Sequence, residues 1–277
     1  MRNIFTVDTE DWFHANYTNN LFQNEASIQS TVEANTDVYL KYFAECGTTA
    51  TFFVLGFVAE QHPALVRRIA EAGHEIASHG YGHQLVYKQT PEEFRQDIRK
   101  SKSLLENVIG KPVWGYRAPS WSITENSLWA LEILTQEGFR YDSSIFPFKN
   151  FLYGIDGAPR FPFPSKLYCK TSDLVEIPPS TVRIPGLNMP FSGGFYFRAL
   201  PFLMIKICAH KVNREGEPVI FYLHPREIDP EQPRLKLSMR DSFIHYFGIR
   251  NCEKKLTRVL KEFPCVSIQQ MLTAESK

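Results

Sequence analysis

Short apolar runs alternate with helically spaced apolar positions along most of the chain. Residues 3–7, 49–55 and 219–223 are rich in apolar and β-favouring residues, which predicts buried strands. Residues 33–46 repeat apolar positions at helical spacing, and Thr90-Pro91-Glu92-Glu93 has the composition of a capping box at the start of another helix. Strand and helix alternate about seven times in this way, which predicts an α/β fold.

Polar residues stand where the predicted strands end. Five of them are Asp8, His79, Arg117, Asp142 and His224. Because (β/α) barrels carry their active sites at the C-terminal ends of the strands, this pattern predicts a distorted (β/α) barrel of about seven strands with its site at those ends. A doubly wound open sheet is the alternative, but it would gather ligands at a switch point and not from strands around a ring.

The alternation breaks after residue 146. Residues 146–190 hold eight of the 18 prolines, scattered among aromatic residues. A disordered segment would be poorer in Phe and Tyr, so we expect an ordered insertion with a strand near residues 174–177. We find no clear linker and predict a single domain over residues 1–277, with an insertion at about 146–215 and a C-terminal helical extension at about 235–277.

Two histidines in the segment HEIASHGYGH give the first indication of chemistry. His79 and His83 lie four residues apart with Gly80 and Gly82 between them, so both imidazoles could converge on one point. Neutral imidazole is the commonest metal ligand, and a hydrolytic metal usually needs a third protein ligand and an open position for water. Two exposed loop histidines are the simpler alternative, which the rest of the chain must argue against.

Composition narrows the classes of partner. The net charge is +1, which gives no indication of a nucleic-acid partner. No run of 18 apolar residues occurs, so we expect no membrane span. The five cysteines form no Cys-x-x-Cys pair, and the N-terminus lacks the apolar core of a signal peptide. We therefore expect a reduced, cytoplasmic protein, unless a leader has been removed.

In their order along the chain, these motifs resemble those of the polysaccharide deacetylases, which are carbohydrate esterase family 4 or the NodB-homology domain. The matching residues are Asp8-Thr9-Glu10-Asp11, Ser78-His79 through His83, Arg117-Ala118-Pro119, Asp142 and Leu223-His224. The resemblance covers about residues 1–145 and 218–227. Each motif is weak alone, and their order makes the match specific. The acidic opening, the SGGFYFR stretch and the HPRE ending are similar to the exopolysaccharide-gene-cluster branch.

The resemblance implies a metal-dependent hydrolase that removes N-acetyl groups from amino sugars of a polysaccharide or glycan precursor. Asp8 would be the general base, and Arg117 would hold its carboxylate in place. His224 would be the general acid, oriented by Asp142. Each has a plainer alternative: a turn cap for Asp8, a structural ion pair for Arg117 and a satisfied strand-end histidine for His224.

The third metal ligand is where the chain departs from the family, in which a second aspartate follows the first directly or after one residue. Here the candidates are Glu10 and Asp11, beside His79 and His83. Asp8 and Glu10 point to the same face of a strand, whereas Asp11 could reach in if the chain turns, so both stay candidates. We expect zinc, although two histidines and a carboxylate also accept cobalt, nickel or iron.

Five further residues are candidates for substrate binding: Pro119, Trp121, Gly193, Gly194 and Tyr196. The aromatic rings could line a sugar groove, and the glycines could let backbone amides approach a saccharide. Core packing and a tight turn are the alternatives.

Two other functions stay open beside the deacetylase. The altered acidic motif motivates a non-catalytic saccharide-binding relative. A metal-independent amidohydrolase of the same fold, acting on a small cyclic amide, would lack an intact metal pair, so His79 and His83 argue against it.

Overall fold

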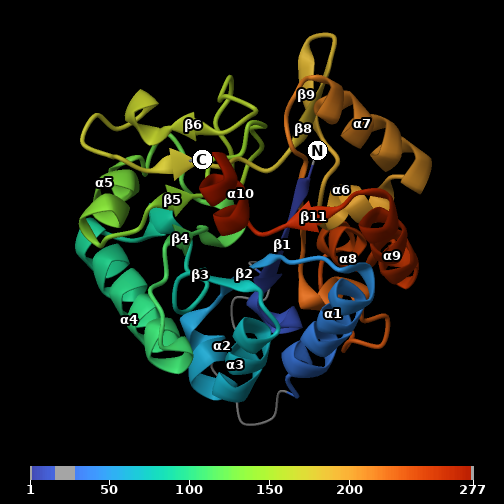
Figure 1. Ribbon diagram of the computed structural model, residues 1–277, viewed down its shortest axis with the longest axis horizontal. Helices are drawn as coiled ribbons and strands as arrows, with labels where there is room; N and C mark the ends of the chain where they lie inside the picture. Colours follow the sequence, from blue (N-terminus) through green and yellow to red (C-terminus); the bar gives the residue numbers. More distant parts are fainter. Residues whose placement is uncertain (1, 16–28, 276–277) are drawn as a thin grey trace. The chain divides into compact units, whose positions relative to one another are not determined.

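The computed structural model describes residues 2–15 and 29–275, which fall into two compact units (Figure 1). One unit joins Met1–Ala50 to Phe191–Lys277, and the other comprises Thr51–Pro190. In the described ranges, no helix combines the length and the apolar character needed to cross a membrane.

The first unit is built on β1 (Asn3–Thr9), which pairs in parallel with both β10 (Ile220–Leu223) and β11 (Cys265–Val266). Every residue of β1 and β10 is buried, as expected for the continuous apolar runs seen in the sequence. Val7 lies beside Leu223 in the parallel register, so the residues that follow the two strands leave them at the same end.

The last long helix of the first unit, α9 (Cys252–Glu262), buries Leu256, Val259 and Leu260, which recur at helical spacing and form its inward face. The helices of this unit are α1 (Val32–Cys46), α6 (Gly194–Ala199), α7 (Phe202–Arg214), α8 (Met239–Tyr246), α9 (Cys252–Glu262) and α10 (Ile268–Glu275), with short 3₁₀ turns η1 (Trp12–His14), η6 (Pro225–Ile228) and η7 (Ile249–Asn251).

The second unit holds a row of short parallel strands. Their order is β2 (Thr51–Val54), β3 (Glu75–Ser78), β4 (Gly115–Tyr116), β5 (Tyr141–Asp142) and β7 (Val175–Glu176), and β6 (Phe163–Pro164) adds an antiparallel edge. His79 and Arg117 therefore follow the neighbouring strands β3 and β4, and Asp142 is the last residue of the next strand, β5, so all three lie at the carboxyl ends of this row. A separate hairpin consists of β8 (Thr181–Ile184) and β9 (Leu187–Pro190).

Helices α2 (Gly56–Gln61), α3 (Pro63–Glu71), α4 (Pro91–Ile109) and α5 (Trp129–Gln136) lie outside these strands (Figure 1). The predicted capping box of α4 is confirmed: Thr90 and Glu93 each accept the backbone N–H of the other. The remaining short turns are η3 (Val86–Lys88), η4 (Pro119–Trp121) and η5 (Ser165–Leu167).

Two helix starts are set by local contacts. Helix α5 begins only at Trp129, because the Ser127 hydroxyl accepts the Thr124 N–H at 2.9 Å and holds a turn there. Gly194 begins α6. Gly193 lies against β10, where an added Cβ would come within 2.1 Å of the Tyr222 carbonyl oxygen. Close packing therefore requires glycine at this position.

Candidate active site

His79 and His83 lie together just beyond β3, and both are buried. Their ring centroids are 5.6 Å apart. Nδ1 of His79 is 2.8 Å from the carbonyl oxygen of Arg117. A carbonyl can only accept, so Nδ1 carries the proton, and in the neutral ring Nε2 bears the lone pair that can bind a cation. A second partner that fixes the tautomer in this way is typical of histidines that bind metals.

The loop that carries the two histidines is held by Asp97, an acid that was not predicted from the sequence to be part of the site. Asp97, on α4, accepts the Tyr81 N–H at 2.9 Å, and burial raises the pKa of its carboxyl. Gly80 has a left-handed φ of 75°, and a Cβ there would meet the Asp97 carboxylate at 2.8 Å. His83 itself has a φ of 54°, a conformation uncommon outside glycine and concentrated at functional sites.

Arg117 follows β4 and is fully buried. Its Nη2 donates to the Ser143 hydroxyl at 2.8 Å, and its guanidinium lies 4.1 Å from the centre of the Phe53 ring. These contacts hold a permanent positive charge at the edge where His79 emerges. A buried, fixed cation at this place can position a carboxylate.

Asp142, at the end of β5, belongs to a pair of buried carboxyls. Its register partner on β7 is Glu176, and the two buried carboxyls interact with each other. The Ser144 hydroxyl donates to Asp142 at 2.5 Å, and the Ile145 N–H donates to Glu176 at 2.9 Å. Burial raises the pKa of both carboxyls, and the charge of Asp142 raises the pKa of Glu176 further. The pair therefore holds protons to higher pH than two separate, exposed carboxyls would.

In the first unit, Asp8 and Glu10 lie beside His224. Asp8 is near the end of β1, and His224 follows β10, the parallel partner of β1. Nε2 of His224 is 3.8 Å from an oxygen of Asp8 and 3.9 Å from an oxygen of Glu10. Two buried carboxylates and an imidazole thus meet at one end of adjacent strands.

The other ring nitrogen of His224 contacts Glu227 and not the predicted partner, Asp142. Nδ1 lies 3.0 Å from the Glu227 carboxylate, which also accepts the His224 backbone N–H at 3.1 Å. Arg198 donates to the other Glu227 oxygen at 2.7 Å. Neither Glu227 nor Arg198 was predicted from the sequence to have a role, although they lie in the HPRE and SGGFYFR stretches, respectively.

Charge sets the protonation of this pair. Burial by itself lowers the pKa of His224, but the neighbouring charges of Glu227, Glu10 and Asp8 outweigh it, so the pKa is raised. Burial by itself raises the pKa of Glu227, but the charges of His224 and Arg198 hold it well below its usual value. The neighbouring carboxylates therefore favour the imidazolium form of His224, which faces the Glu227 carboxylate.

The two candidates for the third metal ligand have different surroundings. Asp11 caps η1, accepting the Trp12 N–H at 3.1 Å, and it also accepts the Thr31 N–H and the Ser30 hydroxyl. Its pKa is raised by burial. Glu10, in contrast, belongs with His79 and His83 to a group of buried side chains, among those that the structure describes, that could hold a metal ion. Two imidazole nitrogens and one carboxylate oxygen match the donor sets of catalytic zinc sites, so these residues fit a divalent metal.

The residues proposed for substrate binding lie in different surroundings. Trp121 is buried and packs on Phe146, with ring centroids 5.3 Å apart, and Pro119 is buried in the same turn. Gly193 and Gly194 lie against Tyr222 of β10. Tyr196 is half-buried on α6, beside Phe195.

Two segments of the chain are similar to known protein families. Residues 25–141 match the family model described as polysaccharide deacetylase, and residues 143–273 match a domain of unknown function, DUF3473. The chain is 35% identical over 106 residues to a peptidoglycan deacetylase of Helicobacter pylori, which is 38% of this chain and 35% of that protein. It is 35% identical over 115 residues to a peptidoglycan-N-acetylglucosamine deacetylase of Bacillus cereus, which is 39% of this chain and 42% of that protein. The matches thus span less than half of these relatives.

A solved structure extends the likeness to the fold. The crystal structure of a putative polysaccharide deacetylase from Mycobacterium smegmatis matches 98% of this chain and 89% of its own, with a TM-score of 0.64 at 20% sequence identity. At this identity the likeness shows the fold alone, and it confirms the predicted α/β fold of distorted-barrel type. Together, the comparisons show that residues 25–141 are similar to polysaccharide deacetylases, that residues 143–273 are similar to DUF3473, and that the fold is that of a solved putative polysaccharide deacetylase.

Proposed function

We propose that the protein is a metal-dependent hydrolase that removes N-acetyl groups from amino sugars of a polysaccharide or glycan precursor. The observation that carries the proposal is the buried group Glu10, His79 and His83, which could hold a metal ion, in a chain whose residues 25–141 match the polysaccharide deacetylase model. The names of the relatives, which act on peptidoglycan, support an N-acetylated saccharide as the substrate class. An exopolysaccharide precursor as substrate, zinc as the metal and a cytoplasmic location stay predictions.

Each residue of the site has a place in this reaction. A bound divalent metal ion would lower the pKa of water and polarise the acetamide carbonyl. Asp8 takes the proton from the attacking water, acting as general base. His224, whose pKa is raised by the charges of Glu227, Glu10 and Asp8, gives its proton to the departing amine. Arg117 holds a fixed positive charge that positions the Asp8 carboxylate.

The supporting chain of contacts has its own role. Glu227 fixes the ring of His224 through Nδ1, so that Nε2 faces Asp8 and Glu10. Arg198 keeps Glu227 ionised and in place, because both side chains are almost completely buried and in direct contact. A buried ion pair of this kind is costly to break once one partner is removed.

Acetate release tests the proposal directly. Purified protein supplied with Zn²⁺ and N-acetylglucosamine oligosaccharides is expected to release acetate, and chelation of the metal should abolish the release. Asp8→Asn removes the base without changing side-chain size, so turnover is expected to fall by roughly 10²-fold or more. Asp173→Asn, at an exposed surface aspartate, should leave turnover unchanged.

The outcomes separate the alternatives. Full turnover after chelation and in Asp8→Asn would contradict the metal-dependent mechanism. Binding of the oligosaccharide with no acetate release from any N-acetylated saccharide would favour the non-catalytic saccharide-binding relative.

A further inference from the structure

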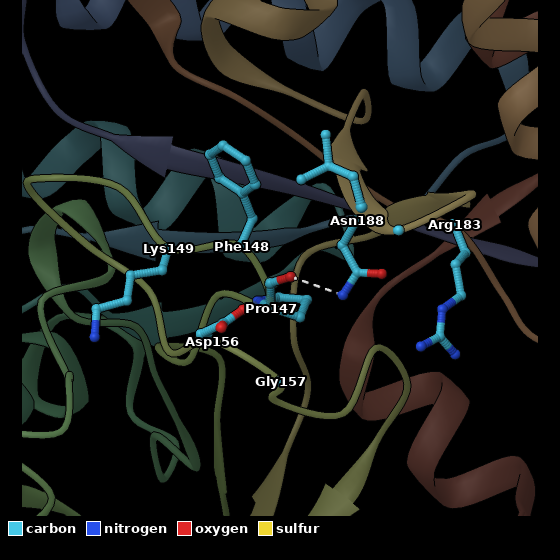
Figure 2. Close-up of a pocket in the computed structure, with 9 residues that line it drawn as sticks. Pro147, Phe148, Lys149, Asp156, Gly157, Arg183 and Asn188 are labelled. Carbon is cyan, nitrogen blue, oxygen red and sulfur yellow. Dashed lines mark hydrogen bonds between the residues drawn. The ribbon is translucent and has the colours of Figure 1, made fainter.

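A pocket of about 560 Å³ lies between residues 147–157 and the β8–β9 hairpin, all within the second unit (Figure 2). Asn188 of β9 donates to the carbonyl oxygen of Pro147 at 3.1 Å and ties the hairpin to the opposite wall, as the dashed line in Figure 2 shows. The volume falls within the roughly 300–1,000 Å³ typical of ligand sites. None of the proposed catalytic residues lines this pocket.

Both walls of the pocket have a defined backbone. In one wall the side chain of Asn150 accepts the N–H groups of Leu152 and Tyr153, at 2.7 and 2.9 Å. Gly154 closes this turn with a φ of 94°, and a Cβ there would meet the carbonyl oxygen of Phe148 at 2.0 Å. The other wall is an antiparallel hairpin whose tight turn contains Gly186, with a φ of 80°. The pocket is therefore a built feature of the insertion.

An aromatic cluster connects the pocket to the edge of the sheet that carries Arg117. Trp121, four residues after Arg117, packs on Phe146 and Tyr153, with ring centroids 5.3 and 5.8 Å apart. Phe146 directly precedes the pocket wall, and the chain reaches it straight from the end of β5. The pocket wall thus follows closely in sequence on the end of β5, which belongs to the same row of parallel strands as β3 and β4, the strands that His79 and Arg117 follow.

The lining chemistry suits a hydroxyl-rich ligand. The pocket is mainly polar and open to solvent, whereas cofactor pockets are mostly apolar and enclose their ligand. Arg183 and Asn188 are register partners across the β8–β9 hairpin. The guanidinium and the amide, both planar hydrogen-bond donors, are therefore carried on the same face of the hairpin. Phe148 adds an aromatic ring of the kind that packs on the apolar face of a sugar ring.

The charges around the pocket are of both signs. Lys149 forms an ion pair with Glu125 at 2.9 Å. Both side chains are half exposed, so the pair contributes little to stability. Asp156 stands opposite Arg183 in the lining. A strongly anionic polymer would require an excess of positive charge, and a neutral ligand requires none.

We propose that this pocket binds neutral sugar units of the same glycan, beyond the unit whose acetamide is hydrolysed, and so makes the enzyme act on chains and not on single sugars. This inference rests on the proposed function, because the glycan is taken to be the substrate of the proposed deacetylase. The binding itself can be measured without turnover.

Calorimetric titration with N-acetylglucosamine oligomers of two to six units tests the pocket. In the chelated, catalytically idle protein, affinity is expected to rise with chain length. Phe148→Ala and Asp156→Ala should each weaken binding of the longest oligomer roughly tenfold, while binding of the dimer stays unchanged. The exposed Phe151 offers a matched control: Phe151→Ala should bind all lengths as the wild type does. Asp156 is exposed, so its variant keeps the test valid if Phe148→Ala fails to fold.

Each result has one reading. Length-dependent binding that is lost in the pocket variants, without acetate release, would support the pocket and overturn the proposed activity. Acetate release with the same KM for dimer and hexamer, in wild type and variants alike, would support the activity and overturn the pocket. Affinity that is the same at every length, or that is unchanged in both pocket variants, would also overturn it.

Discussion

At the scale of single residues, two neighbouring acids of the same motif have different surroundings. Glu10 belongs to the candidate metal group. The next residue, Asp11, caps η1 and accepts hydrogen bonds from the Ser30 hydroxyl and the Thr31 N–H. The sequence left both open as metal ligands, because side-chain length and strand alternation do not show where the strand ends. The backbone turn after Thr9 separates them.

His224 shows the same dependence on its surroundings. The expected orienting residue was Asp142, but the contact to Nδ1 comes from Glu227, three residues along the chain in the turn η6. Because η6 places its third residue back beside His224, a local turn supplies what was expected from a distant strand.

Removing the charge of Glu227 tests this role. In Glu227→Gln the amide can still contact Nδ1, but the carboxylate that favours the imidazolium is lost. We expect kcat to fall roughly 10- to 100-fold with little change in KM, because a general acid contributes about 10²–10⁴-fold and is only partly disabled. The measurement is steady-state acetate release on an N-acetylglucosamine oligomer.

Glu231→Gln, at an exposed position nearby, is the matched control and should keep wild-type kcat. An unchanged kcat in folded Glu227→Gln would remove Glu227 from the mechanism.

At the scale of elements, the pairing of β5 with β7 creates the buried carboxyl pair. Parallel register brings Asp142 beside Glu176, from segments that the sequence predicted as strands without indicating that they are neighbours. Two carboxyls forced together away from water hold a proton that they would otherwise lose. Strand order, which only the folded chain sets, therefore decides the protonation of Asp142.

The pair makes stability depend on pH in a defined direction. Both pKa values are raised above their unfolded values, so the stabilising contribution is complete below about pH 4 and is lost as pH rises through the raised values. Glu176→Gln keeps the size of the side chain but removes one of the two carboxyls. We expect the unfolding free energy of the wild type to fall relative to that of Glu176→Gln between pH 5 and 8, by about 1.4 kcal/mol for each unit of raised pKa.

Urea unfolding monitored by tryptophan fluorescence, repeated across this pH range, measures the difference. Glu71→Gln, at an exposed helix end, should follow the wild-type curve. Parallel curves for the wild type and Glu176→Gln would mean that the pair holds no extra proton.

At the scale of the whole molecule, the candidate metal ligands come from distant parts of the sequence. Glu10 follows β1, whereas His79 and His83 follow β3. A metal ion that binds the folded chain and not the unfolded one stabilises the fold by mass action, by about 2.7 kcal/mol at a hundredfold excess over its Kd.

Thermal unfolding with Zn²⁺ and with a chelator checks this linkage. The Tm is expected to be higher with metal, and His83→Ala should lose that increase. His210→Ala, at a half-exposed histidine of α7, should retain it. The same Tm with and without metal, or the same increase in His83→Ala, would contradict metal binding at this group.

The sequence alone determined the elements and the residues at their ends. Apolar runs identify strands because a strand covered on both faces must be apolar throughout, and the box at Thr90 identifies a helix start because its hydrogen bonds are local. The order of motifs then indicated the family. These signals depend on residues close together in the sequence.

Only the tertiary structure decided which side chains meet. It placed Glu227 on His224, Glu176 on Asp142 and Asp97 beneath the histidine loop. It also formed a pocket from residues 147–157 and the β8–β9 hairpin. Such contacts depend on strand order, on turn geometry and on how deeply a charge is buried, and these are properties of the folded chain that no local pattern of residues contains.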